Sequence, residues 1–163
     1  MSILLTGATG FVGGAIAANL ADNGLLGDTR FAVRGETPAE GFVRLQNNLR
    51  RFQLPQTVLD GISEAQIVPF DLRNAAGAKL GDPEIIINCA ALATFSNHPS
   101  LWETNVDGVL ALGRQAVQGK RLKRFLQVGT GMSCGKLADR LVQESWNVPP
   151  LEQHAVQYTY SKG

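Results

Sequence analysis

The amino-acid sequence predicts an α/β fold in three layers, in which a doubly wound parallel sheet lies between two layers of helices. Short apolar runs alternate along the chain with segments of helical periodicity, which is the order of repeated strand–helix–strand units. Strands joined in this way run parallel, and their crossovers place helices on both faces of the sheet. The run Ile85-Ile86-Ile87 is apolar without alternation, as in a strand that is buried on both faces.

Five strands and three longer helices follow from these patterns. The predicted strands cover residues 3–5, 31–33, 67–70, 84–89 and 125–128. Helical spacing recurs after residue 11, over residues 42–52 and over residues 101–117. The residues expected on the inner side of the last helix are Val106, Val109, Leu110 and Ala116. Residues 136–157 show no regular pattern, and a further helix is predicted to begin at Tyr158.

Length and composition indicate one ordinary globular domain. The chain has 163 residues, 44% of them hydrophobic and 18% charged, with a net charge of +1, so nucleic acid is not an expected partner. No apolar run reaches the roughly 18 residues that a membrane span needs. Cys89 and Cys134 lack metal-ligand spacing, so we expect two reduced thiols, no metal site and a cytoplasmic protein. His98 and His154 are expected on the surface or in loops.

A glycine-rich segment lies between the first strand and the first helix. Gly7 permits a tight turn, Gly10 lets a pyrophosphate approach the backbone, and Gly13 lets the helix pack closely on the strand. The amino end of the helix then offers free N–H groups to the phosphates. The segment predicts a dinucleotide site of the Rossmann type. Its phosphate-binding residues are expected to be Gly7, Thr9, Gly10, Phe11, Val12 and Gly13.

The end of the second strand predicts which dinucleotide binds. An acidic residue at this point holds the ribose 2′-hydroxyl of NAD, whereas an arginine accommodates the 2′-phosphate of NADP. Here the strand ends in Val33-Arg34-Gly35, and the first carboxylate is Glu36. Because a guanidinium binds phosphate through two parallel hydrogen bonds, NADP is favoured over NAD, with Arg34 as its ligand. The alternative is that Arg34 is a solvated surface residue.

Tyr158 and Lys162 have the spacing of residues on one face of a helix. A phenol gives up its proton reluctantly at neutral pH, and a nearby ammonium favours the phenolate. The pair therefore predicts proton transfer by Tyr158, with Lys162 tuning it, although this spacing also occurs by chance. A hydroxyl after the fifth strand would bind the substrate oxygen, and Thr130 and Ser133 are the candidates.

Five motifs, in order along the chain, resemble those of extended short-chain dehydrogenases/reductases. They are Thr6-Gly-Ala-Thr-Gly-Phe-Val-Gly13, Asp71-Leu72, Asn88-Cys89-Ala90-Ala91, Asn105-Val106-Asp107-Gly108 and Tyr158-Thr-Tyr-Ser-Lys162. The resemblance implies an adenine contact for Asp71, a ribose contact for Lys162, and Thr130 as the catalytic hydroxyl. The other cofactor contacts that it implies are Leu72, Cys89, Ala90, Ala91 and Asn105. Relatives carry Ser-Thr-Ala or Ser-Ser-Ala where this chain has Gly-Thr-Gly, which leaves Ser133 as the fallback.

Within that family the chain looks like the thioester reductase and fatty acyl-CoA reductase branch. The similar segments are Val33-Arg34, Arg44-Leu45-Gln46-Asn47-Asn48-Leu49 and residues 84–95. The resemblance implies reduction of a carbonyl or acyl thioester, on coenzyme A or a carrier protein, to an aldehyde or alcohol. Sugar-nucleotide epimerases or dehydratases are the competing enzymes, but they favour an acidic end to the second strand. A non-catalytic dinucleotide sensor is the third alternative, although sensors often lose the tyrosine–lysine pair that this chain keeps.

The sequence ends at Gly163, one residue beyond Lys162. Members of the family continue into a sixth strand and a small substrate lobe. We therefore expect residues 1–163 to be the N-terminal part of a dinucleotide-binding domain, truncated after the fifth strand and weakly active or inactive by itself. Such a half-sheet would also expose apolar surface through which copies of the chain could associate.

Overall fold

A computed structural model describes residues 1–137, 141–144 and 147–163. Within this part of the chain, five parallel strands form one sheet in the order β3-β2-β1-β4-β5. Central β1 pairs with β2 through Leu5 and Phe31 and with β4 through Leu5 and Ile87. The strands are β1 Ile3–Thr6, β2 Thr29–Val33, β3 Ile67–Pro69, β4 Ile85–Asn88 and β5 Arg124–Gln127. The predicted Rossmann-type sheet is confirmed, since this order is that of its first five strands.

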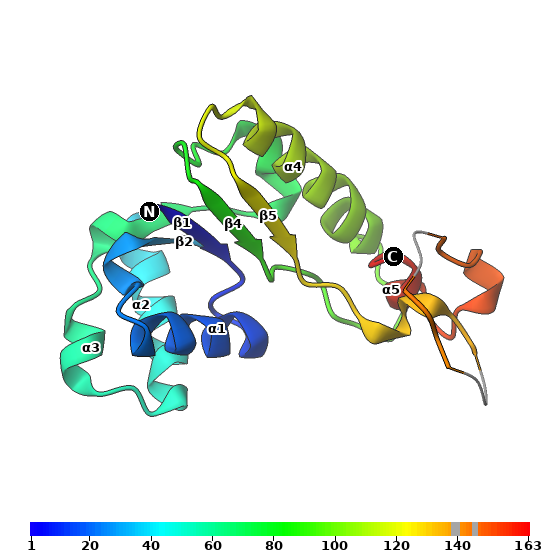
Figure 1. The fold of residues 1–163 in the computed structure, drawn as a ribbon, viewed down its shortest axis with the longest axis horizontal. Coiled ribbons are helices and arrows are strands. Elements are labelled where there is room, and N and C mark those ends of the chain that lie inside the picture. Colours follow the sequence, from blue (N-terminus) through cyan, green and yellow to red (C-terminus); the bar gives the residue numbers. More distant parts are fainter. Residues whose placement is uncertain (138–140, 145–146) are drawn as a thin grey trace.

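Helices connect the strands and form the two outer layers (Figure 1). The α-helices are α1 Phe11–Asp22, α2 Pro38–Leu49, α3 Gln56–Asp60, α4 Gly108–Gln118 and α5 Gln157–Tyr160. Short 3-10 helices are η1 Leu26–Asp28, η2 Arg50–Phe52, η3 Glu64–Gln66, η4 Leu72–Gly77, η6 Gly131–Cys134 and η7 Leu151–Gln153. One turn of π-helix, η5 Glu103–Asp107, leads into α4. Helix α2 begins earlier than its apolar spacing predicts, because Thr37 caps it and Pro38 fits its first turn.

Two apolar cores lie on opposite faces of the sheet. Alternate side chains of β1 enter different cores, since successive residues of a strand point to opposite faces. Leu5 packs with Phe31 and Leu45 beneath α1 and α2, and Leu4 packs with Ile86 and Leu112 beneath α4. Figure 1 shows α1, α2 and α3 on one side of the sheet and α4 on the other. The predicted three-layer arrangement is therefore confirmed.

Helix α4 approaches the opposing backbone through a glycine. A Cβ atom at Gly108 would overlap the carbonyl of Leu72 in η4, so only a glycine fits there without a shift. The prediction that Leu110 faces the sheet is wrong, since its side chain is 51% exposed and Leu112 is buried instead. Leu110 is two residues from both Gly108 and Leu112, which places it on the opposite face of the helix. The apolar run around Leu110 is nearly continuous, so the sequence does not show which of its residues face the sheet.

Among the described residues, no helix is long and apolar enough to cross a membrane.

Edge strand β5 is the most open part of the sheet, with Leu126 48% exposed. After β5 the chain leaves the sheet, and its last described segment lies beyond the end of the strands, with α5 beside α4 (Figure 1).

Asn48 of α2 fixes the loop that follows β1. Its buried side-chain amide donates to the carbonyl oxygens of Ala8 and Gly10, at 2.9 Å each. Gly14 of α1 leaves room for this amide, because a Cβ atom there would lie 2.6 Å from Asn48 Nδ2. The two carbonyl groups thus keep partners inside the protein, and the loop is tied to a helix in the core.

Replacing Asn48 by alanine tests this role. The variant leaves the Ala8 carbonyl without this partner and removes one of two donors to the Gly10 carbonyl, which should lower the free energy of unfolding by about 1–3 kcal/mol in urea denaturation. The control is Asn47→Ala, because the exposed side chain of Asn47 accepts a bond from the side chain of Arg50 and, among the described residues, no other. That change should stay within about 0.5 kcal/mol of the parent. Equal stability of the two variants would contradict the role of Asn48.

Candidate functional site

A cavity of about 400 Å³ opens at the carboxyl ends of the strands. It lies where the chain order reverses, between β1 and β4, which is where doubly wound sheets bind ligands. Loops that follow four strands line it. The lining residues are Gly7, Thr9, Gly10, Ala32, Val33, Arg34, Phe70, Asp71, Leu72, Arg73, Cys89, Ala90, Ala91, Leu92, His98, Ser100 and Thr104. Nine of the residues predicted to bind a cofactor are therefore brought together here: Gly7, Thr9, Gly10, Arg34, Asp71, Leu72, Cys89, Ala90 and Ala91.

The glycines have the contacts that their spacing predicts. Gly7 has φ +71°, and a Cβ atom there would lie 2.6 Å from the backbone nitrogen of Ala90. A Cβ atom at Gly13 would overlap the carbonyl oxygen of Gly7. Gly10 has only the carbonyl oxygen of Gly7 nearby, 3.3 Å from the position of a Cβ atom. Gly7 and Gly13 thus permit close backbone packing, whereas Gly10 keeps the cavity wall free of a side chain.

Backbone N–H groups at the start of α1 follow directly on Gly10, which lines the cavity. Gly14 makes the first α-helical bond, to the carbonyl of Gly10 at 3.0 Å, so Phe11, Val12 and Gly13 precede it without helical acceptors. The side chain of Phe11 is 80% exposed, and it is the backbone that offers donors to a ligand. These groups fit a pyrophosphate, because the helix terminus adds a partial positive charge.

Polar side chains, of which Thr6 and Asn88 are buried, bridge the ends of three neighbouring strands. Thr6 donates its hydroxyl hydrogen to the side-chain oxygen of Asn88, whose amide donates to Gln127 at 2.7 Å. The N–H of Ala90 donates to the Thr6 hydroxyl at 3.1 Å. These bonds hold the turn after β4 against the glycine loop. Thr6 and Gln127 were not among the predicted residues, although a polar residue that ends an apolar strand is a signal for such a bridge.

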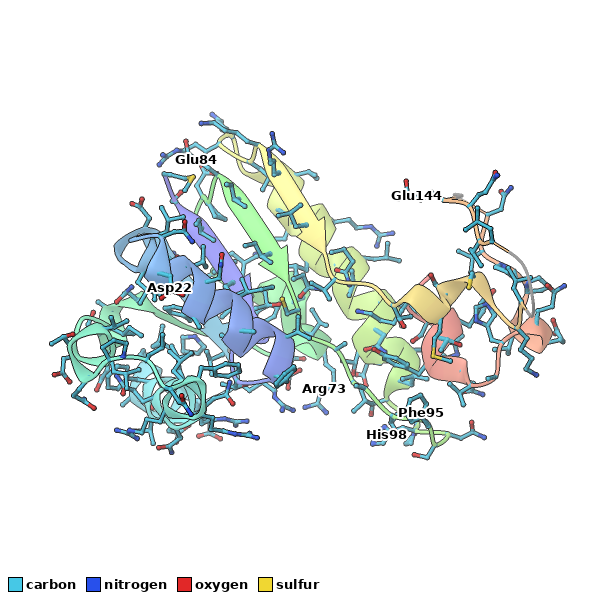
Figure 2. All side chains as sticks on the ribbon, turned by 60° about the horizontal axis from the view of Figure 1, so that its bottom comes forward. Asp22, Arg73, Glu84, Phe95, His98 and Glu144 are labelled. Carbon is cyan, nitrogen blue, oxygen red and sulfur yellow. The ribbon has the colours of Figure 1, made fainter. Side chains whose placement is uncertain are left out.

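Arg34, Asp71 and Arg73 meet at the end of the cavity nearest β2 and β3. Arg34 is exposed, as a guanidinium that must reach a ligand would be. The carboxylate of Asp71 accepts three hydrogen bonds from Arg73, and they hold the pKa of Asp71 below its usual range. Sequence reasoning missed Arg73. Figure 2 shows it at the same edge of the sheet as Phe95 and His98.

Asn105 lies behind the cavity rather than in its wall. Its buried amide accepts from the N–H of Leu92 at 2.8 Å and donates to the carbonyl of Leu92 at 3.1 Å. It also donates to the hydroxyl of Ser161 at 3.0 Å. Asn105 thus ties the loop after β4 to the turn that carries Lys162, and its predicted direct contact with a cofactor stays a prediction.

The predicted catalytic residues come from two loops beyond the sheet. Thr130 begins η6, and its hydroxyl accepts the N–H of Met132 at 3.3 Å. Lys162 lies in the turn after α5, close to Gly129, where a Cβ atom would be 3.7 Å from the Lys162 carbonyl oxygen. Burial lowers the pKa of Lys162, and the nearby Cys89 opposes that shift. Lys162 therefore lies near Cys89, which lines the cavity, but is not itself among the lining residues.

The two tyrosines of α5 have different surroundings. Tyr158 meets the ring of Phe95 edge-on at 6.3 Å, and Phe95 is 73% exposed on the loop after β4. Tyr160 instead packs against Trp102 at 5.5 Å and against His154 at 5.3 Å. Both tyrosines are half-buried, but Tyr158 contacts a single exposed ring whereas Tyr160 packs against two rings.

The two histidines were predicted to lie on the surface or in loops. Exposed His98 and His154 both lie in loops, but His154 is buried rather than on the surface. His154 is 5% exposed, and its ring nitrogens bond the Thr159 hydroxyl at 3.0 Å and the Pro149 carbonyl at 3.1 Å. Cys89 and Cys134 are free and half-buried. In the described part of the chain, no three His, Cys, Asp or Glu residues gather around a possible metal site.

Comparison with known proteins identifies the family of this site. The model of an NAD-binding family, described as male sterility protein, matches residues 5–162. A search of curated proteins gives no match. Among solved structures, the chain is similar to the terminal R domain of the myxalamid PKS-NRPS biosynthetic pathway, with a TM-score of 0.79 and 25% identity. That comparison covers 99% of this chain and 42% of the other.

Two further structures share the fold at lower identity. A thiolation-reductase di-domain from an archaeal non-ribosomal peptide synthetase has a TM-score of 0.75 and 23% identity, over 99% of this chain and 45% of that one. UDP-glucuronic acid 4-epimerase from Bacillus cereus, in complex with UDP-glucuronic acid and NAD, has a TM-score of 0.65 and 21% identity, over 99% and 49%. The chain thus spans less than half the length of these structures.

The resemblance to extended short-chain dehydrogenases/reductases, and to their thioester reductase branch, is confirmed by the family match and by the structural neighbours. A nicotinamide dinucleotide is the cofactor that the family and the glycine loop have in common. The match covers nearly the whole sequence, from within β1 to the lysine after α5. The chain therefore belongs to the NAD-binding family described as male sterility protein, among the extended short-chain dehydrogenases/reductases.

Proposed function

We propose that residues 1–163 form the cofactor-binding part of an NADPH-dependent oxidoreductase that reduces a carbonyl or acyl thioester. The observation that carries this proposal is the cavity, which has the phosphate-binding loop in its wall and Lys162 beside its lining residue Cys89. The nearness of Lys162 to this cavity supports the proposal that the glycine loop and the tyrosine–lysine pair act on one bound dinucleotide. When bound, the nicotinamide dinucleotide supplies the hydride for the reduction.

The proposed preference for NADP rests on Arg34. Its side chain lines the cavity after β2, where NAD-selective sites carry a carboxylate that holds the ribose 2′-hydroxyl. A guanidinium binds a phosphate through paired, charge-assisted hydrogen bonds. Opposite Arg34, the carboxylate of Asp71 keeps one oxygen with room for a further donor, such as the amino group of adenine.

Tyr158, Lys162 and Thr130 are assigned the proton chemistry. Tyr158 gives its phenolic proton to the substrate oxygen as the carbonyl carbon is reduced, and the Lys162 ammonium favours the resulting phenolate. Thr130 donates its hydroxyl hydrogen to the same oxygen and stabilises its developing charge. The Thr130 hydroxyl accepts from Met132, which leaves its hydrogen for the substrate, whereas Ser133 already donates to the Thr130 carbonyl at 2.9 Å. Thr130 is therefore preferred over Ser133.

The acyl substrate class is supported by the surroundings of Tyr158. Exposed Phe95 lies edge-on to its ring and offers an apolar wall beside the reacting oxygen. The myxalamid R domain and the archaeal thiolation-reductase di-domain, both similar to this chain, belong to assembly-line enzymes. We accordingly propose an acyl thioester on a carrier protein or coenzyme A as substrate, ahead of a sugar nucleotide.

Fluorescence titration with NADPH and NADH tests the cofactor assignment. The parent chain should bind NADPH more tightly, and Arg34→Asp should weaken NADPH binding by about 10–100-fold, because it removes charged hydrogen bonds worth roughly 1.5–3 kcal/mol. Arg114→Asp makes the same charge change on α4, away from the cavity, and should leave both affinities almost unchanged. Equal binding of the two dinucleotides by the parent chain would refute the NADP preference.

The catalytic assignment is tested by a pair of tyrosine variants. In the full-length product of the gene that encodes residues 1–163, Tyr158→Phe should lower the rate of NADPH oxidation with an acyl thioester by about 10²–10⁴-fold, because it removes the proton donor. Tyr160→Phe keeps the ring that packs on Trp102 and His154 and should retain most of the activity. Full activity of Tyr158→Phe would exclude its proposed role.

The buried position of Lys162 predicts a pH-dependent difference in stability. Because burial lowers its pKa in the folded chain, charging Lys162 opposes folding below that pKa, and the penalty vanishes as pH rises through about 10.4, the value for an unfolded lysine. The stability gained in Lys162→Met should thus be largest near neutral pH and shrink toward pH ~11. Urea unfolding at several pH values measures this difference in stability, in a Cys89→Ala background where the thiol cannot titrate. A pH-independent difference would contradict the assignment.

A further inference from the structure

Arg73 holds the only acidic side chain among the described residues that line the cavity. Its guanidinium donates to both carboxylate oxygens of Asp71, from Nη2 to Oδ2 at 2.7 Å and from Nε to Oδ1 at 3.2 Å. Its backbone N–H donates to Oδ1 at 3.0 Å. One residue therefore fixes the orientation of this carboxylate and cancels its charge.

The pairing matters because Arg34 lies close enough to Asp71 to interact with it electrostatically. Without Arg73, the Asp71 carboxylate would be free to draw the Arg34 guanidinium toward itself. It would also face any anion that Arg34 binds. A 2′-phosphate carries roughly two negative charges at neutral pH, so an unpaired carboxylate beside it would repel it strongly.

The geometry leaves Asp71 able to recognise adenosine. Oδ1 takes two donors from Arg73, which fill its two acceptor positions, and Oδ2 takes one. The remaining acceptor position on Oδ2 suits a neutral amino group. The pair thus accepts a hydrogen-bond donor without presenting a net negative charge.

We propose that Arg73 determines specificity for 2′-phosphorylated dinucleotides by holding Asp71 in a neutral pair, which leaves Arg34 free to bind the 2′-phosphate. Arg73 is a positioning residue in this proposal, since it acts through Asp71 and Arg34. The inference rests on the proposed NADP preference and adds a residue on which that preference depends.

Calorimetric titration of the chain with adenosine 2′,5′-bisphosphate and with adenosine 5′-monophosphate tests the proposal. Both probes need only the adenosine end of the cavity and differ by the 2′-phosphate. Arg73→Gln should weaken binding of the bisphosphate by about 5–10-fold, because the unpaired Asp71 carboxylate then repels the 2′-phosphate through partly screening solvent. Binding of the monophosphate should change little. Arg73→Lys retains the charge and should keep most of the discrimination.

The double variant Asp71→Asn/Arg73→Gln decides how Arg73 acts. It removes both charges, so bisphosphate binding should recover most of what Arg73→Gln loses. Arg73 is 48% exposed, and unfolding curves of each variant check that the fold is retained. A loss that the double variant does not reverse would overturn the proposal and indicate that Arg73 contacts the phosphate itself.

Two other outcomes separate this inference from the function on which it rests. Equal affinity of the parent chain for both probes would refute the NADP preference and the inference with it. The parent chain and Arg73→Gln could instead prefer the bisphosphate over the monophosphate by the same factor. That result would leave the NADP preference intact and overturn only the role of Arg73.

Discussion

The whole site depends on a close contact between backbones where the loop after β1 passes the end of β4. Gly7 turns there with a positive φ, and it lies so near Cys89 and Ala90 that a side chain would collide with their backbone. Gly13 then packs against Gly7 itself. This double contact aims the first turn of α1 at the cavity, because the helix cannot tilt away without opening the loop. Cofactor binding is therefore a consequence of how tightly the centre of the sheet packs.

Polar groups hold this arrangement where apolar packing ends. Asn48 satisfies two carbonyl groups of the glycine loop, and Thr6 links that loop to Asn88. The bonds from Asn48 to Ala8 and from Thr6 to Asn88 lie among buried atoms, so breaking either would leave a polar group without water or a partner. The charged side chains suit an anionic dinucleotide. Arg34 lies at one end of the cavity and Lys162 lies near its lining residue Cys89. Beside Arg34, the ion pair with Arg73 neutralises the charge of Asp71.

The order of the strands and the glycine loop could be predicted because both follow from local patterns: apolar runs, helical spacing and glycines at fixed positions. The hydrogen bonds from Asn48 to the glycine loop could not be predicted, because a local pattern does not tell which polar residue of a helix is buried. Arg73 was missed for a related reason, since its partner Asp71 was interpreted only as a ligand of adenine. Leu110 was misplaced, and the burial of His154 in its loop was not foreseen, because long-range packing decides the burial of both residues.

The two ends of the cavity are held by forces of different kinds, and this bears on how binding and catalysis are coupled. The adenosine end belongs to β1, β2 and β3, which are buried between two apolar cores. The proposed catalytic end depends on four-residue α5, which is held by the bond from Asn105 to Ser161 and by the ring contacts of its two tyrosines. Extended apolar cores resist local opening better than the few contacts of a single helical turn. The adenosine end should therefore keep its shape when the position of Tyr158 shifts, which lets the cofactor bind before the catalytic groups are finally arranged.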